Sequence, residues 1–202
     1  FKQVLVAGFL SGGSDDVDAN LETVRLLRSE LRNQGELSVI DAEVIPLNET
    51  ASSQLPDTPI TAESSESGAL QDQETLAIIE NEEMLELYEY IFADVEYWKR
   101  LGEEYQGPLI VTGTVMFMPH ARAGFVQREE EIFDSFGQRL VVPVRSYEER
   151  KGFVLEPQFV FIDGRTGTTI YSETFREEVL YSADRATSEL SSYFELMERL
   201  VP

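Results

Sequence analysis

The chain has 202 residues, 42% of them hydrophobic and 10% aromatic, which is enough to bury a core in a folded domain. Its formal net charge of −22 argues against binding to nucleic-acid phosphates or to an anionic membrane surface, because both need a basic face. Cysteine is absent, so a disulfide framework, a thiolate metal site and a cysteine nucleophile are all excluded within this sequence.

Two features of the sequence concern targeting. No apolar run in it approaches the roughly 18 to 20 residues that a membrane-spanning helix needs. The first residue, Phe1, stands almost directly before the apolar run of the first predicted strand, so we expect an upstream signal or lipidation segment. Contact with a membrane is therefore expected only through an amino-terminal anchor.

The first 45 residues predict a β-α-β unit. Residues 4–10 form a short apolar run that predicts a buried strand, and residues 37–45 predict a second one. Between them, an acidic helix-start signal and a stop at Gly35 bracket an amphipathic helix. Its apolar positions, at three- and four-residue steps, are Leu21, Val24, Leu27 and Leu31. Because crossovers of this kind are right-handed, the two strands should lie parallel.

The middle of the chain changes character twice. Residues 46–73 are rich in Ser, Thr, Glu and Gln, and they predict a flexible insertion rather than a separate domain. A single helix is then predicted from about Glu74 or Glu82 to Tyr105, because apolar residues recur there at helical spacing.

The remainder of the chain is rich in strand signals. Apolar and β-branched runs predict three strands, over 109–118, 153–162 and 168–175. Residues 119–150 are polar and turn-rich and predict an extended hairpin arm, whereas 190–201 predict a final amphipathic helix. Together these elements predict one α/β domain over 1–202. Its mixed β-sheet is parallel at the β-α-β start and antiparallel at the hairpin, is covered by about three helices, and carries a protruding β-hairpin arm.

The sequence contains little that predicts catalysis. His120 is its only histidine, so a two-histidine metal site is impossible and a hydrolytic triad would have to use this residue. Serine and aspartate are abundant, which leaves a hydrolase using His120 and nearby acids as an alternative, although the G-x-S-x-G elbow is missing. We therefore predict no catalytic residue, no metal site and no bound cofactor.

The arm is the part of the sequence that most suggests binding. It carries large apolar side chains, although a long hairpin leaving a small domain has little core to face. Either the arm folds back and packs, or it offers these side chains to another chain. Its arginines alternate with acids, which fits a partner-binding edge or protection of the hairpin against aggregation. The residues predicted to bind a protein partner or to mediate self-association are Phe125, Phe133, Phe136, Arg139 and Arg145.

The strand segments resemble one family. Val4-Leu-Val-Ala-Gly-Phe9, Leu37-Ser-Val-Ile-Asp41, Pro108-Leu-Ile-Val-Thr-Gly-Thr-Val115 and the hairpin from Phe159 to Ser172 are similar to strands of the TolB amino-terminal domain and of the curli-secretion lipoprotein (CsgG) group. The resemblance covers most of residues 1–45 and 82–200. It implies a periplasmic protein of a diderm bacterium, lipid-anchored through an upstream cysteine, that works in binding or assembly rather than in catalysis.

The arm departs from the family pattern. The resemblance implies that, in the secretion channel, the segment at this position is a membrane hairpin, and that several subunits form the channel together. Here residues 129–131, Arg139 and Arg145 interrupt the apolar alternation that a lipid-facing strand requires. We therefore predict a non-catalytic periplasmic binding or assembly module that is tethered to the outer membrane and binds no nucleic acid. A hydrolase and a ring-forming secretion channel component remain the alternatives.

Overall fold

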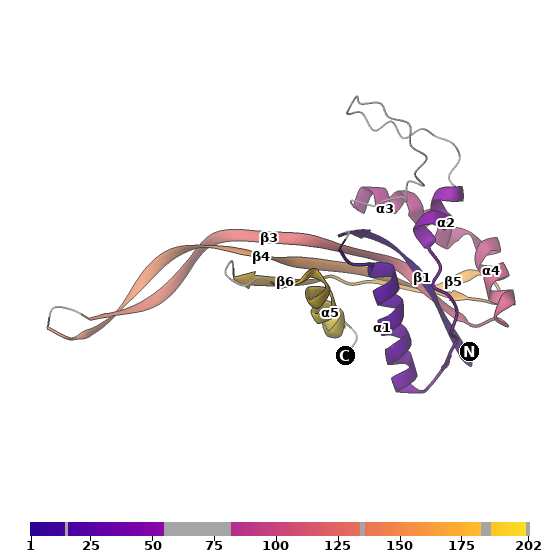
Figure 1. Ribbon diagram of the computed structural model, residues 1–202, viewed down its shortest axis with the longest axis horizontal. Helices are drawn as coiled ribbons and strands as arrows, with labels where there is room; N and C mark the ends of the chain where they lie inside the picture. The colour runs from indigo at the N-terminus through magenta and orange to yellow at the C-terminus, as the bar shows by residue number, and fades with distance from the viewer. Residues whose placement is uncertain (15, 55–81, 134–135, 183–186, 201–202) are drawn as a thin grey trace, which may run out of the picture.

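The computed structural model describes residues 1–14, 16–54, 82–133, 136–182 and 187–200 (Figure 1). The strands of this part of the chain are β1 (Gln3–Gly13), β2 (Ser38–Val39), β3 (Leu109–Phe133), β4 (Arg139–Asp163), β5 (Thr168–Thr174) and β6 (Glu177–Ser182). Its helices are α1 (Ala19–Gln34), α2 (Leu47–Gln54), α3 (Glu82–Tyr88), the 3-10 helix η1 (Glu89–Ala93), α4 (Val95–Glu104) and α5 (Glu189–Leu200).

The strands form one mixed sheet in the order β2-β1-β3-β4-β5, with β6 also paired to β4. β1 runs parallel to both β2 and β3, as the β-α-β reading predicted. β3 and β4 are antiparallel, and β4 pairs antiparallel with β5 near its end and with β6 nearer its middle. The predicted α/β class with a mixed sheet is confirmed, and more helices cover the sheet than the three expected.

Helices cover both faces of the sheet (Figure 1). Successive residues of a strand point to opposite faces, so odd- and even-numbered residues of β3 enter different cores. Val115 and Phe117 pack with α1 and α5 in one core. Ile110 and Met116 pack with α2, α3, η1 and α4 in the other, around the fully buried Trp98. The sheet is therefore the middle layer of three.

Helix α1 begins and ends where its sequence signals predicted. The Asp18 carboxylate accepts a hydrogen bond from the Leu21 amide (2.9 Å), which satisfies a free donor of the first turn. Gly35 follows the helix in the left-handed conformation, with φ of 68°, and its amide donates to the Leu31 carbonyl (3.3 Å).

The single long helix predicted up to Tyr105 is wrong, because the chain divides it into α3, η1 and α4. The division falls at Asp94, whose carboxylate accepts from the Tyr97 amide (3.0 Å) and so caps a new helix. The indole of Trp98 donates to the Ile91 carbonyl (2.7 Å), which fixes the 3-10 turn against α4. An unbroken helix would leave this buried indole donor without that carbonyl.

Two further segments differ from the prediction. The first residues of the predicted insertion 46–73 form helix α2, with Leu47 and Ala51 fully buried against the sheet, whereas residues 55–73 lie outside the described residues. The predicted strand 37–45 keeps ladder pairing only in β2. Beyond β2, the amides of Ile40 and Ile45 still donate to carbonyls of β1 (2.9 Å each). The side chain of Asn20 also bridges the two segments: it accepts from the Phe9 amide (2.8 Å) and donates to the Ile45 carbonyl (3.2 Å).

Close packing of α4 against the β4–β5 turn depends on Gly102. A Cβ atom at this position would lie 1.8 Å from the carbonyl oxygen of Gly164. We expect Gly102→Ala to lower the free energy of unfolding by about 1–3 kcal/mol through overpacking, although alanine is the better helix former by about 1 kcal/mol. Gly124→Ala is the control, since nothing lies within 4 Å of its Cβ position. Urea unfolding measures both variants, and equal stability of the two would contradict the contact.

Candidate functional site

The arm consists of the outer parts of β3 and β4, beyond the reach of the other strands. Pairing of β1 with β3 ends at Phe117, and pairing of β6 with β4 ends at Arg150. Farther out, from Ala123 opposite Glu149 to the tip, the two strands pair only with each other in the described part of the chain. Figure 1 shows this ribbon extending along the long axis, away from all the labelled helices. Within the described residues, it therefore has two open edges and no covering layer.

One face of the arm carries an aromatic cluster. Phe125 and Tyr147 are cross-strand partners, and their ring centroids lie 5.3 Å apart at an interplanar angle of 69°. The guanidinium carbon of Arg145 lies 5.2 Å from the centroid of the Phe125 ring, in cation–π geometry. The structure thus brings the predicted residues Phe125 and Arg145 together and adds Tyr147 to them.

The other predicted residues gather at the tip. Phe133 and Arg139 are cross-strand partners, and the Arg139 guanidinium forms an ion pair with the Glu131 carboxylate. Phe136 lies in the turn that follows. The exposed fraction is 67% for Phe125, 70% for Phe133 and 88% for Phe136, so none of the three rings is buried in a core. The five predicted residues therefore form two groups, one midway along the arm and one at its tip.

The opposite face of the arm is partly covered by its own side chains. Val126, Val142 and Val144 are half-buried there, and Arg128 forms an ion pair with Glu148. Cross-strand pairs of this kind contribute about 0.2–1 kcal/mol each. A two-stranded hairpin held only by such pairs is marginally stable in water, so a binding partner would add substantially to the order of the arm.

Besides the five residues predicted to bind a partner, the arm exposes further large apolar side chains. They are Ile132, Leu140, Val141 and Tyr147. The signal for Tyr147 was present in the sequence: a turn centred on Phe136 places residue 147 opposite residue 125. Applying that register to the predicted hairpin would have identified the aromatic pair.

His120 lies at the base of the arm and is half-buried. Its Nε2 atom is 3.5 Å from a carboxylate oxygen of Glu178, and Glu178 also pairs with Arg122 at 3.3 Å. In the described part of the chain, the buried Nε2 atom of His120 has no hydrogen-bond partner. The geometry around this residue is that of a charged cluster where the arm leaves the sheet, and it does not form a serine–histidine–acid arrangement.

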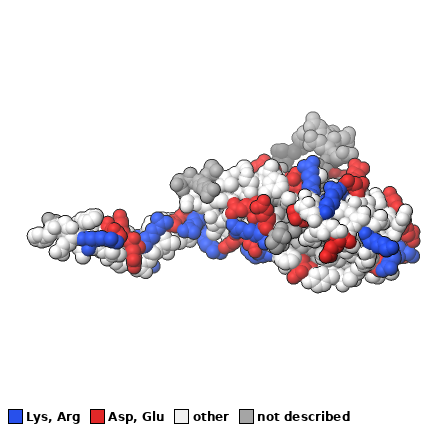
Figure 2. All heavy atoms as spheres, turned by 90° about the horizontal axis from the view of Figure 1, so that it is seen from below, with Lys and Arg blue, Asp and Glu red and all other residues white. Residues whose placement is uncertain are grey.

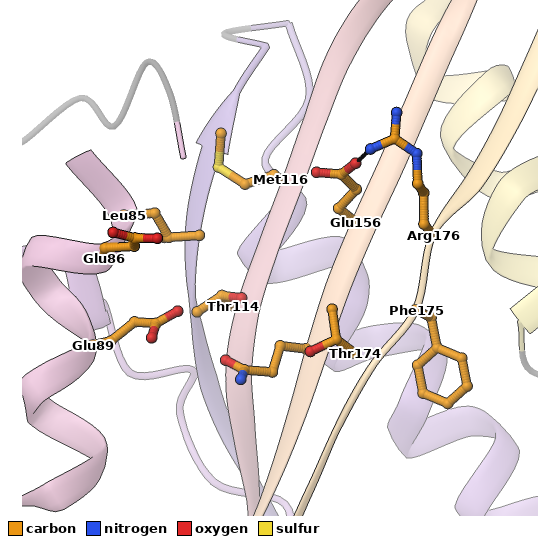
Figure 3. Close-up of a pocket in the computed structure, with 10 residues that line it drawn as sticks. Leu85, Glu86, Glu89, Thr114, Met116, Glu156, Thr174, Phe175 and Arg176 are labelled. Atoms are coloured by element: carbon orange, nitrogen blue, oxygen red, sulfur yellow. Dashed lines mark ion pairs between the residues drawn. The ribbon is translucent and has the colours of Figure 1, made fainter. Parts of the chain in front are cut away.

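A polar pocket of about 370 Å³ lies between the sheet and helix α3 (Figure 3). Glu86 and Glu89 line its helix side, and Thr114 lies on its strand side. At its far end, the Glu156 carboxylate forms an ion pair with Arg176. The excess of carboxylates disfavours an anionic ligand such as a phosphate.

Two properties of the described residues concern metal binding and membrane insertion. In this part of the chain, no group of three or more histidine, cysteine or acidic residues is arranged to hold a metal ion. Among the helices that the structure describes, none has the length and apolar character to span a membrane.

Comparison with known proteins gives a distant structural likeness. No family model and no curated protein matches the chain. One similar solved structure is the lipoprotein GNA1162 of Neisseria meningitidis, at 11% identity and a TM-score of 0.44, covering 100% of this chain and 96% of that one. A likeness at this level carries no argument about function. The resemblance to the TolB and CsgG group, read from the strand sequences, is not confirmed by these comparisons and stays a prediction.

Proposed function

We propose that the protein is a non-catalytic binding or assembly module of the bacterial cell envelope, and that its arm binds another protein chain. The observation that carries this proposal is the uncovered ribbon with three phenylalanines that are each more than half exposed. Exposed apolar surface of this extent on an ordered element is typical of an interaction site.

The arm offers a partner both side chains and backbone. Aromatic residues and arginine dominate the energetics of protein interfaces, and Phe125, Tyr147 and Arg145 stand together on one face. The open edges of β3 and β4 also present unpaired donors and acceptors that an added strand can use. Both modes suit a protein ligand better than a small molecule, which needs a concave site.

Charge distribution favours the arm as the place of contact. Residues 119–150 contain five arginines and six acids, so the arm has a formal charge of −1 within a chain of −22. Figure 2 shows both signs interspersed along the arm and a mostly uncharged outer end. Because nearly all of the net negative charge lies elsewhere, an acidic partner is repelled only weakly at the arm.

The envelope location is supported by the resemblance of the strand sequences alone. It agrees with a chain that contains no cysteine. Cell fractionation of the full gene product tests it: recovery in the cytosol would refute the location and leave the binding role of the arm open.

A photo-reactive phenylalanine analogue placed at position 133 is expected to give a discrete covalent adduct with a neighbouring protein in living cells. The side chain at this position is 70% exposed, so the substitution leaves the fold intact. The matched control places the analogue at Leu190 on α5, a side chain that is 44% exposed outside the arm. Adducts are resolved by electrophoresis and mass spectrometry. Equal labelling from both positions would contradict a binding role for the arm.

A further inference from the structure

An apolar groove of about 570 Å³ opens on the body of the protein, between helix α1 and strand β5. Leu27 and Leu31 of α1 form one wall, Phe161 of β4 contributes to the floor, and Ile170 and Tyr171 of β5 form the other wall. Its volume falls within the roughly 300–1,000 Å³ of pockets that enclose a sizeable ligand. The groove is therefore large enough to bury bulky side chains.

The groove runs along β5, the edge strand of the described sheet. Every residue of β5 is exposed. The register of β4 and β5 shifts after Phe161, which leaves Ile170 without a β4 partner and places it beside Tyr171 along the groove. Ile170 is 54% and Tyr171 53% exposed. The Tyr171 hydroxyl donates to Glu173 (2.8 Å), and this hydrogen bond raises the pKa of Tyr171.

The chain itself carries a segment that complements this groove. The arm tip presents Phe133 and Phe136 as exposed apolar side chains and Arg139 as a cation. The groove has an apolar lining with two carboxylates among it, Glu30 and Glu173. The ion pair of Arg139 with Glu131 is exposed on both sides, and such pairs are worth about 0–1 kcal/mol, so Arg139 can exchange partners at little cost.

The contact can form only between copies. Figure 1 shows the arm tip at one end of the long axis and β5 with α1 toward the other, so the tip cannot reach its own groove. The arm of a second copy also approaches this acidic body with little net repulsion, since its formal charge is only −1 against −22 for the whole chain.

We propose that the groove between α1 and β5 receives the arm tip of a second copy of this chain, which joins the molecules head to tail. The inference rests on the proposed function, because it names the partner of the same arm. A head-to-tail contact uses two different surfaces, so it builds rings or open chains rather than a closed pair of identical arms.

A mixing experiment tests this contact. The tip variant carries Phe133→Ser and Phe136→Ser with an intact groove, and the groove variant carries Ile170→Lys and Tyr171→Lys with an intact tip. All four positions are more than half exposed, so both variants should fold. Sedimentation velocity over a concentration series should show larger assemblies for the unmodified chain and monomers for each variant alone. An equimolar mixture should form dimers and nothing larger, because one tip and one groove remain functional. Leu190→Lys, outside both surfaces, is the matched control and should assemble like the unmodified chain.

The other possible results of this experiment show whether the groove contact fails alone or together with the binding role of the arm. If the groove variant assembles like the unmodified chain while the tip variant is monomeric, the arm binds elsewhere, and the groove inference fails while the proposed function stands. A mixture that stays monomeric, or an unmodified chain that is monomeric at every concentration, also overturns the groove inference. If the tip variant and the groove variant both assemble normally, the binding role of the tip fails together with the inference.

Discussion

Replacing residues 123–149 with Asn-Gly is expected to abolish association while leaving the stability of the body unchanged. Arg122 and Arg150 already pair across the hairpin, so a two-residue turn can close the shortened strands without changing their register. No residue of the removed segment belongs to either core cluster, so its loss removes no buried contact from the described body. The effect on association should be complete, because every predicted contact residue of the arm is removed.

Two measurements distinguish an effect on association from an effect on folding in this variant. Trp98 is the only tryptophan and is fully buried on α4, so its fluorescence reports unfolding of the body in urea. Sedimentation velocity reports association in the same samples. An unchanged urea midpoint with loss of association is the expected outcome. Normal association of the shortened protein would refute a binding role for the arm, whereas a lowered midpoint would show that the arm supports the body.

The sequence predicted those elements whose signals are local. The apolar stripe of α1 and its caps at Asp18 and Gly35 lie within one helix, and the apolar runs of β1 and β3 need no knowledge of their neighbours. The turn after Ile162 likewise contains its own glycines. Local periodicity and capping signals were therefore sufficient to predict the mixed α/β architecture.

The errors arose where distant residues decide the local structure. Asp94 and Trp98 divide the predicted long helix because a buried indole needs the Ile91 carbonyl, a requirement set by tertiary burial. Asn20 bridges the Phe9 amide and the Ile45 carbonyl from a helix that lies 25 residues before Ile45, a contact that no local pattern of residues 37–45 predicts. Helix α2 was missed because its sequence is mostly polar, and only two of its residues, Leu47 and Ala51, belong to the core.

The candidate site shows the same limit. The exposed aromatics of the arm could be predicted from composition and hairpin length, and even the pairing of Phe125 with Tyr147 follows from the position of the turn. The groove could not, because its walls come from α1, β4 and β5. The shape of the groove depends on a register shift after Phe161, and no sequence pattern in β5 predicts this shift.

Phe117→Ala should lower stability without affecting association, whereas Phe125→Ala should weaken association without affecting global stability. Both residues lie in β3 and point to the same face. Phe117 is fully buried, stacks on Phe153 at 5.0 Å and meets Tyr193 edge-on at 5.3 Å. Its truncation leaves a cavity in the core between the sheet and α5. Loss of a buried phenylalanine costs about 3–5 kcal/mol, so the urea midpoint should fall strongly.

Phe125→Ala removes a ring that contacts Tyr147 and Arg145 but no core residue. A cross-strand pair is worth about 0.2–1 kcal/mol, and its loss acts on opening of the arm rather than on global unfolding. The global free energy of unfolding, measured by Trp98 fluorescence in urea, should therefore change by less than about 0.5 kcal/mol. Association should weaken in this variant, whereas the folded fraction of Phe117→Ala should associate normally. A destabilised Phe125→Ala with normal association would show that β3 is one continuous structural strand and that its outer half has no separate binding role.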